Sequence, residues 1–387
     1  MELVEVKSKA EVQEFLNLPV RLYKNESNWI RPLDKDVEGV FDMGVNKTFK
    51  FGECIRWIAQ ENGKTVGRIA AFVNNKTANK NNDQPTGGMG FFECIDDQPT
   101  ADFLFDACKN WLQSKGMEAM DGPINFGDRD KWWGLLIDGF DIEPNYQCNY
   151  NFAYYQQLVE NYGFQVYFKQ FTFIRNTFDP FDPRIMKKAE ILNQDPDYSF
   201  EHMKLKNLKK YANDFRVVYN LAWANHDGVA GMSEEQADAI MKQMKPIIDE
   251  KIIWFAYYKG DPVAFYINLP EVNQVFKHVN GKLDLIGKLK FVWHKWRKTN
   301  KKMLGLVFGV APEHQGKGLD GALVMATAQM VQQDYKRYPI LEMNWIGDFN
   351  RKMIIVVKQI GGEIGKTHHT YRYLFDRSKP FERMPIK

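Results

Sequence analysis

The chain has 387 residues, of which 44% are hydrophobic and 26% charged, and its net charge is +3 at pH 7. This length exceeds one ordinary hydrophobic core and suits two domains of roughly two hundred residues each. The composition is typical of a soluble globular protein, and the small net charge gives no strong signal for binding nucleic acid.

Four widely spaced cysteines indicate the redox environment of the protein. Cys54, Cys94, Cys108 and Cys148 form no Cys-x-x-Cys pair and have no histidine at metal-ligand spacing. We therefore expect free thiols in a reducing cytoplasm and no bound metal. The charged N-terminal stretch is unlike a signal peptide. No uncharged apolar run approaches the roughly 20 residues that span a bilayer, so the sequence predicts a cytoplasmic protein without a transmembrane segment.

The first half of the chain predicts a hairpin followed by alternating strands and helices. Residues 54–74 alternate around an Asn-Gly turn, which predicts two strands, and residues 88–95 predict a short apolar strand. A stripe that includes Leu104 and Cys108 at four-residue spacing then predicts a helix. The segments MEAMDGPI, YYQQLVENYGF and YFKQFTFI predict a strand, a helix and a closing aromatic strand.

The second half repeats this order. Residues 251–270 predict a second hairpin and residues 303–310 a second apolar strand; a striped helix follows, and then PILEMNWI, RKMIIVVKQIGG and THHTYRYLF in the same succession. Hairpins combined with strand–helix–strand units predict an α/β fold with mixed sheets. Two prolines and acidic residues interrupt the pattern at 176–183. We therefore predict two tandem domains, residues 1–178 and 179–387.

A glycine-spaced loop follows the apolar strand of the second half, in the stretch VAPEHQGKGLDGAL at residues 310–323. Gly316 and Gly318 let the backbone approach a ligand closely, and Lys317 adds a positive charge. The N-terminus of the helix that follows offers up to four unpaired N–H groups. Hydrogen bonds to a charged group are worth roughly 1.5–3 kcal/mol each, so a few such groups would hold a diphosphate firmly. The loop matches neither a Walker motif nor a dinucleotide-binding fingerprint.

The stretch LVFGVAPEHQGKGLDGALV, followed by LEMNWIGDFNRKMIIVVKQIGG, resembles the GNAT family of acyl-CoA N-acyltransferases. Gln315, Gly318 and the position of Asp320 fall on the loop signature of this family, and Asn350 falls on its later Asn. The order of elements matches over nearly all of residues 200–377. With its repeated order of elements, the chain resembles a tandem GNAT protein whose first half lacks the glycine loop.

This resemblance implies a co-substrate and a reaction. The central strand would splay from the next strand, the pantetheine arm of coenzyme A would lie in the gap, and the loop would hold the diphosphate. The implied reaction is transfer of an acyl group to an amine, with acetyl-CoA (or another acyl-CoA) as donor and no metal. The residues that the resemblance assigns to CoA are Phe308, Gly309, Val310, Gln315, Gly316, Lys317, Gly318, Leu319, Asp320, Gly321 and Asn350.

Two positions depart from the family pattern. Asp320 stands where the family has Gly or Ala, and a carboxylate ~5 Å from a diphosphate costs about 3 kcal/mol per charge pair in a protein-like dielectric. Its place on the helix allows it to point to water instead and to favour the helix N-terminus. Val357 stands where the family has its Tyr general acid. Tyr371 and Tyr373 on the last strand become the candidate proton donors, with packing in the sheet as the alternative.

In the first half, CIDDQPTADF occupies the place of the glycine loop. Asp96 and Asp97 would repel phosphate, and Pro99 lacks an N–H donor, so we expect a structural partner domain. The long aromatic segment 126–155 follows the next strand. It predicts either a lid over the acceptor groove or a satellite hydrophobic cluster.

Amine acylation needs a base for the ammonium group and donors for the oxyanion. Glu342 and Asn344 alternate on one strand and share a face beside the expected gap, so both are candidate catalytic residues. Glu342 is the candidate base, and a solvent-facing carboxylate is the alternative. His368 and His369 point to opposite faces of a strand and are expected to be ordinary strand residues. His226 is expected to be a cap or loop residue.

Residues 286–302 carry seven Lys or Arg, one His and no acidic residue, with Trp293 and Trp296 interleaved. This segment predicts a surface for an anionic partner, such as anionic lipid, an acidic acceptor or the 3′-phosphate of CoA. A solvated basic face is the alternative.

The function predicted from the sequence is therefore acyl-CoA-dependent N-acyl transfer, with acetyl transfer to an amine as its expected form. Two alternatives stay open. Aminoacyl-tRNA-dependent peptidyltransferases also carry two such folds, but they take no CoA and have no use for the glycine loop. A non-catalytic acyl-CoA-binding or scaffold protein would agree with Val357 and Asp320.

Overall fold

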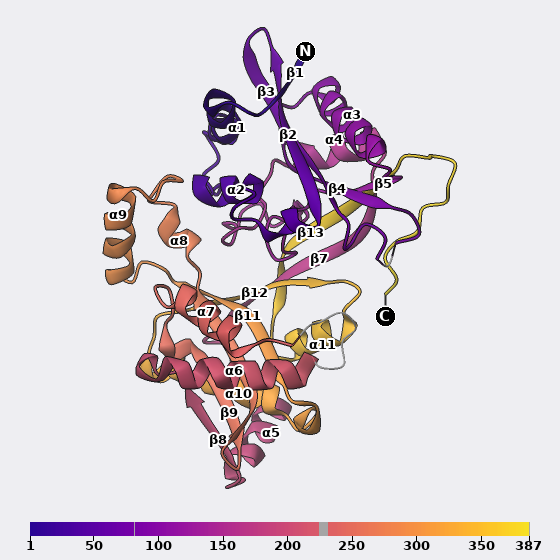
Figure 1. Ribbon diagram of the computed structural model, residues 1–387. Helices are drawn as coiled ribbons and strands as arrows, with labels where there is room; N and C mark the ends of the chain where they lie inside the picture. The colour runs from indigo at the N-terminus through magenta and orange to yellow at the C-terminus, as the bar shows by residue number, and fades with distance from the viewer. Residues whose placement is uncertain (81, 224–230, 387) are drawn as a thin grey trace.

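The computed structural model describes residues 1–80, 82–223 and 231–386. A mixed sheet runs through both halves of the molecule, and helices pack on its faces (Figure 1). The helices and strands of the first half are β1 (Glu2–Glu5), α1 (Lys9–Leu22), α2 (Asp34–Phe41), β2 (Gly52–Glu61), β3 (Lys64–Asn74), β4 (Thr86–Cys94), α3 (Gln98–Ser114), β5 (Ala119–Gly122), β6 (Leu135–Asp138), α4 (Tyr154–Tyr162) and β7 (Gln165–Asn176).

The second half repeats the hairpin and the strand–helix–strand units that its sequence predicts. Its helices and strands are α5 (Pro183–Gln194), β8 (Tyr198–His202), α6 (Leu208–Trp223), α7 (Glu234–Met244), β9 (Ile253–Tyr258), β10 (Asp261–Pro270), α8 (Asn273–Phe276), α9 (Leu285–Trp296), β11 (Lys302–Val310), α10 (Leu319–Gln329), β12 (Ile340–Gly347), α11 (Arg351–Gln359) and β13 (Glu363–Leu374).

The strands of the sheet follow the same order of pairing from either edge towards the centre. Its strand order is β1-β2-β3-β4-β5-β13-β7-β12-β11-β10-β9-β8, and β6 pairs with β13. On each side, antiparallel strands lead to a parallel pair, β4–β5 in the first half and β11–β12 in the second. The predicted α/β fold with a mixed sheet is confirmed.

The last strand of each half lies in the sheet of the other half. β13 pairs with β5 of the first half, whereas β7 pairs with β12 of the second half. β7 and β13 also pair with each other at the centre of the sheet. A boundary near residue 178 therefore divides the chain without dividing the sheet, and the assignment of two separate domains stays a prediction.

Alternating side chains of the second half's strands form two cores. On β9, Ile253, Phe255 and Tyr257 pack with residues of α6 and α7. Trp254 and Ala256 point to the opposite face and pack with residues of α5, α10 and α11. This period of two is what a strand buried on both faces requires. The face that carries α10 and α11 is the one that holds the candidate site.

Most helices of the molecule begin with a side chain that satisfies their free N–H groups. Ser8 and Ser233 form capping boxes at α1 and α7, and Asp97 accepts a hydrogen bond from Thr100 at α3. Helix α10 begins after Gly318, which has no side chain to offer, and within the described residues α2, α4 and α8 also lack a side-chain cap. The start of α10 is therefore distinguished by its left-handed glycines and not by the missing cap alone.

Candidate functional site

The start of α10 carries the loop that the sequence assigns to a diphosphate. Gly318 is the N-cap residue with a φ of 95°, and Gly316 has a φ of 75°, both in the left-handed region that favours glycine. Among the described residues, no side chain caps this helix. The first N–H groups of α10 therefore have no helical partner and are available to an anion. A Cβ at Gly316 would meet no atom within 4 Å, so the loop is open there.

A groove runs from this loop between α10 and α11. Gln315 Nε2 donates a hydrogen bond to Val310 O at 3.1 Å, which fixes the turn after β11. Asn350 Oδ1 accepts one from Met353 N at 3.2 Å and caps α11. Lys317, Gly318 and Gly321 belong to the loop and first turn without lining the groove. The other residues assigned to CoA line it: Phe308, Gly309, Val310, Gln315, Gly316, Leu319, Asp320 and Asn350.

The strands β11 and β12 separate beside this groove. Their parallel pairing ends at Gly305 and Met343, although β11 continues to Val310 and β12 to Gly347. Successive residues of a strand direct their backbone groups to alternate sides. Every second residue between 306 and 310 therefore presents its N–H and C=O to the gap. The expected splay of the central strand is confirmed, and its free edge offers donors for a carbonyl.

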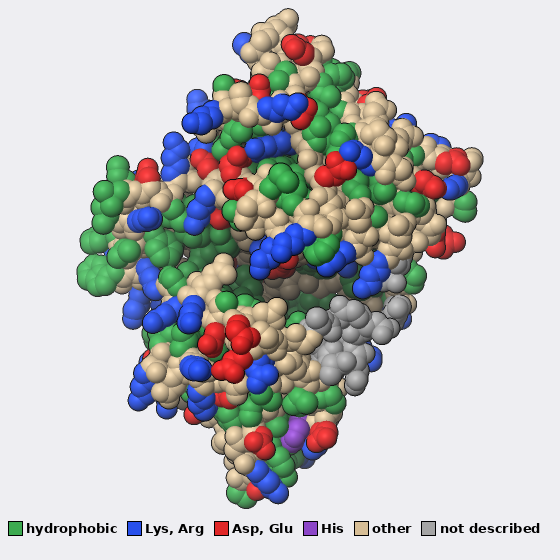
Figure 2. Space-filling view, in the orientation of Figure 1, with side chains coloured by type: hydrophobic (Ala, Val, Ile, Leu, Met, Phe, Trp, Pro, Cys, Tyr) green, Lys and Arg blue, Asp and Glu red, His purple; other side chains and the backbone are tan. Residues whose placement is uncertain are grey.

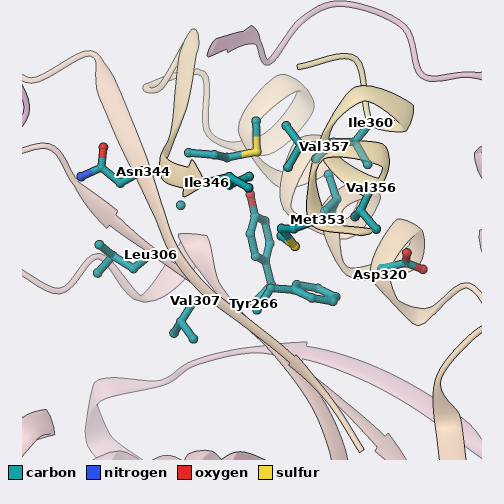
Figure 3. A pocket seen from close by; sticks show the side chains of 14 residues that line it. Tyr266, Leu306, Val307, Asp320, Asn344, Ile346, Met353, Val356, Val357 and Ile360 are labelled. Atoms are coloured by element: carbon teal, nitrogen blue, oxygen red, sulfur yellow. The ribbon is translucent and has the colours of Figure 1, made fainter. Parts of the chain in front are cut away.

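The gap opens into an apolar pocket (Figure 3). Leu306 and Asn344 lie at one end of the view and Val357 and Ile360 of α11 at the other, with Tyr266 between them. The pocket and the groove are adjacent, because Phe308, Asp320, Met353 and Val356 line both of them.

The hydroxyl of Tyr266 is a polar group in the middle of this apolar pocket. Its side chain is 5% exposed, and Tyr266 Oη is buried without a hydrogen bond of good geometry among the described residues, although the Asn268 side chain lies close enough to lower its pKa. Tyr266 lies on β10 opposite Phe308 of β11, and the two rings meet edge-on with centroids 5.7 Å apart. Burial raises the pKa of Tyr266 above its ordinary value of 10, so the hydroxyl stays protonated at neutral pH. It can therefore donate a hydrogen bond to a ligand in the pocket.

Glu342 lies on β12 in a buried ion-pair cluster and does not line the pocket. Its side chain is 0% exposed, its Oε2 is 2.8 Å from Lys366 Nζ, and its Oε1 pairs with Lys302. Burial raises the pKa of Glu342, but the two ammonium groups outweigh this effect, and the pKa lies below its ordinary value. A carboxylate held in this way is a weak base. The alternative interpretation of Glu342 as a solvent-facing carboxylate is therefore wrong, and its role as a base, directly or through water, stays a prediction that the ion pairs disfavour.

Asn344 does share a face with Glu342, as the alternation on β12 predicts. Asn145 Nδ2 donates hydrogen bonds to Glu342 Oε2 at 2.6 Å and to Asn344 Oδ1 at 2.8 Å. Asn344 also lines the apolar pocket, whereas Glu342 does not. Of these two candidates, Asn344 is the one that a ligand in the gap would contact.

The long segment 126–155 of the first half covers this face of the second half. Besides Asn145, its Cys148 Sγ accepts a hydrogen bond from Asn344 Nδ2 at 3.4 Å. At the other end of the segment, Trp132 packs in a hydrophobic cluster of the first half. The end of the segment around Trp132 thus forms the predicted hydrophobic cluster. The end around Asn145 covers the face of β12 that carries Asn344. That the covered face receives the acceptor stays a prediction.

Tyr371 and Tyr373 lie in the core of the first half, away from the pocket. Tyr371 is 0% exposed, and its hydroxyl donates to Glu160 Oε1 at 2.8 Å. Tyr373 packs on Tyr162 with ring centroids 4.8 Å apart. The prediction that either tyrosine supplies a proton to the second half is wrong, because strand exchange carries β13 into the first half. Val357 is fully buried and lines the pocket, so α11 has no proton donor at that position.

Asp320 is half-buried and lines both the groove and the pocket. Figure 3 shows Asp320 at one side of the pocket, with its carboxylate turned away from Tyr266. The position of Asp320 on the helix allowed its side chain to point to water. In the structure the residue lines the groove and is only partly exposed. Its position in the first turn of α10 favours the helix dipole, but the same charge opposes an anion at the loop.

The other residues singled out in the sequence are histidines and cysteines. His368 and His369 lie on β13, and His226 lies outside the described residues. The described part of the chain contains no group of three or more metal-ligating side chains. Within the same residues, no helix combines the length and apolarity needed to cross a bilayer. The four cysteines are free thiols, as expected.

Two curated proteins are similar to this chain over nearly their whole length. It is 25% identical over 376 residues to a bacterial ceramide synthase of Caulobacter vibrioides, covering 96% of this chain and 97% of the relative. It is 24% identical over 373 residues to Protein YghO of Escherichia coli, covering 94% and 93%. No family model matches the sequence.

Solved structures show the same architecture. A tandem GNAT protein from the clavulanic acid biosynthesis pathway aligns with a TM-score of 0.54 at 11% identity, covering 98% of this chain and 99% of that one. A GCN5-related N-acetyltransferase from Sphaerobacter thermophilus aligns with a TM-score of 0.50 at 10% identity, covering 99% and 98%. This chain therefore has the tandem GNAT-like fold, and the resemblance drawn from its sequence is confirmed at the level of the fold.

Proposed function

We propose that this chain is an acyl-CoA-dependent N-acyltransferase whose second half holds the thioester. One observation carries the proposal: the uncapped, glycine-opened start of α10 lies at a groove that shares four lining residues with the apolar pocket between β11 and β12. The loop would bind the diphosphate, the groove the pantetheine arm, and the gap the acyl group. An anion-binding helix start joined to an apolar pocket fits a ligand that is charged at one end and apolar at the other.

We further propose a long-chain acyl group and an acceptor amine of lipid character. The relative of Caulobacter vibrioides is named a ceramide synthase, and a ceramide is the N-acylated form of a long-chain amine. The pocket supports this proposal, because its wall is built largely from the apolar side chains Leu306, Val307, Met343, Ile346, Met353, Val356, Val357 and Ile360. Acetyl transfer from acetyl-CoA is the narrower expectation from the sequence, and the donor series described below separates the two.

The chemistry assigns a role to each end of the pocket. The amine nitrogen attacks the carbonyl carbon of the thioester, and the C–S bond breaks as the amide forms. Backbone N–H groups on the free edge of β11 would stabilise the oxyanion. Tyr266 Oη would donate a proton to the departing sulfur, a role that Val357 cannot fill. The ammonium form of the acceptor first loses one proton to water. The neutral nitrogen then gives up a second proton as the amide forms, and this proton restores Tyr266 Oη after the hydroxyl has protonated the sulfur, so the reaction releases one proton overall. Asn344 would position the amine.

A non-catalytic acyl-CoA-binding protein is the second candidate, because Val357 and Asp320 replace family residues in the site. The open glycine loop disfavours an aminoacyl-tRNA-dependent peptidyltransferase, which has no diphosphate to bind. A cytoplasmic location stays a prediction from the free cysteines.

The test is release of CoA thiol from acetyl-CoA and palmitoyl-CoA, each with sphinganine as the amine. We expect thiol release from palmitoyl-CoA that depends on sphinganine, with formation of the amide detected by mass spectrometry. Binding of both CoA esters without thiol release would establish the non-catalytic candidate. Amide formation that requires charged tRNA in place of acyl-CoA would contradict the proposal.

A further inference from the structure

Helix α9 turns its larger apolar face to solvent. The face contains six side chains that are 51% to 75% exposed: Leu285, Ile286, Leu289, Val292, Trp293 and Trp296. Their spacing at three and four residues places them in one stripe along the helix. A helix on a protein surface normally directs such a stripe into the core, so this orientation calls for a partner.

Other residues of α9 make the contacts between this helix and the rest of the molecule. Asp284 caps its start, accepting a hydrogen bond from Gly287 N at 2.8 Å. The ring of Phe291 stacks on that of Phe276 of α8 with centroids 5.5 Å apart. The exposed stripe therefore takes no part in these contacts and remains free for another surface.

Basic side chains surround the apolar stripe. Lys288, Lys290, Lys295, Arg297, Lys298 and Lys301 are exposed, and residues 285–302 contain no acidic residue. Figure 2 shows apolar side chains gathered at the end of the molecule where Figure 1 places α9, with blue Lys and Arg side chains around them. This charge disfavours pairing of two copies through α9, because each copy would bring the same cations and no acidic residue to the contact.

We propose that α9 docks this protein on an anionic membrane surface, lying in the plane of the interface. The apolar stripe would enter the boundary between headgroups and acyl chains, and the cations would lie among anionic headgroups. Two tryptophans in the stripe fit the interface, where indole rings concentrate. The 12 residues of α9 are too few to span a bilayer, and docking needs no span.

The docked helix lies near the face that would receive the acceptor. Phe276, which stacks on α9, also contacts Tyr146 of the covering segment with ring centroids 5.3 Å apart. Tyr146 directly precedes Gln147 and follows Asn145, whose side chain contacts Asn344. Delivery of a lipid amine from the membrane to this face rests on the proposed function, but the docking itself does not.

The experiment is co-sedimentation of the full-length chain with vesicles of phosphatidylcholine alone and with vesicles that also contain phosphatidylglycerol. We expect strong binding to the anionic vesicles that weakens as salt is raised, and weak binding to phosphatidylcholine alone. The variant Leu289→Asp/Trp293→Asp should lose binding at least ten-fold. The matched control is Met186→Asp/Ile191→Asp, which places the same charges on exposed apolar positions of α5 and should bind as wild type does.

A second variant, Lys288→Glu/Lys290→Glu, keeps the stripe and decides the question if the first variant does not fold. It should bind the anionic vesicles at least ten-fold less tightly than wild type. Wild type that stays in the supernatant, or α9 variants that sediment as wild type does, would overturn the docking. Concentration-dependent dimers that the Leu289→Asp/Trp293→Asp variant abolishes, without vesicle binding, would assign α9 to a second copy instead. None of these results depends on catalytic activity.

Discussion

The same strand–helix junction occurs twice in this molecule and is built differently each time. In the first half, β4 leads to α3, and Asp97 Oδ2 accepts a hydrogen bond from Thr100 N at 2.9 Å. In the second half, β11 leads to α10, which begins at Gly318 without a side-chain cap. The first junction satisfies its helix N-terminus with its own carboxylate, whereas the second leaves the N–H groups free. The comparison teaches that two junctions of the same fold differ in their capping residue, and this difference is why the anion site is proposed for the second half alone.

The gap beyond each junction differs in the same way. In the first half, the hydroxyl of Tyr155 accepts a hydrogen bond from Cys94 N at 2.9 Å and donates one to Glu93 Oε2 at 2.8 Å. Tyr155 is fully buried in the core, so the first half fills this position with its own side chain. In the second half the gap is a pocket, and within the part of the chain that the structure describes Tyr266 Oη makes no such hydrogen bond. These differences support a structural role for the first half.

The buried carboxylates of the two halves offer the largest contrast. Glu342→Gln leaves the ammonium groups of Lys302 and Lys366 buried without a counter-charge, and should cost about 3–5 kcal/mol of unfolding free energy. Glu93→Gln should cost less, because burial raises the pKa of Glu93 and its contact with Arg68 is 3.4 Å long. Urea denaturation of both variants measures the contrast. Equal losses of unfolding free energy in the two variants would show that Lys302 and Lys366 add nothing at Glu342 beyond what Arg68 adds at Glu93.

The same pair predicts a pH dependence. Burial raises the pKa of Glu342, but Lys366 and Lys302 lower it by more than burial raises it. The pKa therefore lies below its ordinary value of 4.5. The stability advantage of wild type over Glu342→Gln should therefore be fully present above pH 4.5 and shrink as the pH falls through the lowered folded-state value. Denaturation series at several pH values measure this advantage. An advantage that grows on acidification would contradict the ion-pair assignment.

Blocking the open junction should remove its function. Gly316→Asp places a carboxylate where the diphosphate would bind, and should weaken CoA affinity by about 100- to 1,000-fold through lost N–H contacts and repulsion. The matched control is Gly260→Asp in the β9–β10 turn. Gly316 and Gly260 have φ angles of 75° and 92°, and a Cβ at either meets no atom within 4 Å. Calorimetry measures the CoA affinity of both variants. Similar affinities of the two variants would show that the glycine loop does not bind CoA.

Tyr266 and Tyr371 provide the test of proton donation. Tyr266→Phe should lower kcat by about 100-fold with little change in acyl-CoA affinity, because only the departing sulfur needs the hydroxyl. Tyr371→Phe removes a hydroxyl of the first half's core and should leave kcat unchanged, with a loss of about 1 kcal/mol in stability. Steady-state thiol release measures kcat for both. A larger loss of kcat in the Tyr371 variant would reverse the assignment.

The smallest expected effect is an increase in affinity. Asp320→Asn removes a negative charge from the wall of the groove and should tighten CoA binding by about ten-fold, less than an unscreened charge pair would give. Glu313→Gln removes an exposed charge from the same loop outside the groove, and should leave the affinity unchanged. Calorimetry at low and high salt compares the two. Weaker binding by the Asp320 variant would mean that the carboxylate helps to hold the ligand.

The sequence predicts the elements of this fold well, because hydrophobic periodicity and turn residues are local signals. It does not predict that β7 and β13 exchange places, since strand pairing is decided by contacts between distant segments. That exchange is why Tyr371 and Tyr373 were misplaced. The glycine loop and Asn350 could be assigned to the groove because their positions are fixed along one stretch of chain.

The errors at Glu342 and Tyr266 have the same origin. The alternation on β12 gives the correct face for Glu342, but its partners Lys302 and Lys366 come from two other strands. In the segment FYINLP, Tyr266 looks like any alternating strand residue. Its significance depends on a gap between β11 and β12, which forms only when the sheet is assembled. A tyrosine on the strand beside a predicted splay is the signal that future sequence analysis can use.

A crystal structure of the protein with bound CoA would test the central claim most directly. The account predicts one CoA per chain, with its diphosphate within hydrogen-bonding distance of the N–H groups at the start of α10 and its pantetheine arm between β11 and β12. No CoA should bind at the corresponding place at α3, because the Asp97 side chain occupies it. A diphosphate bound elsewhere, or an α10 corner that stays empty at saturating CoA, would contradict the account.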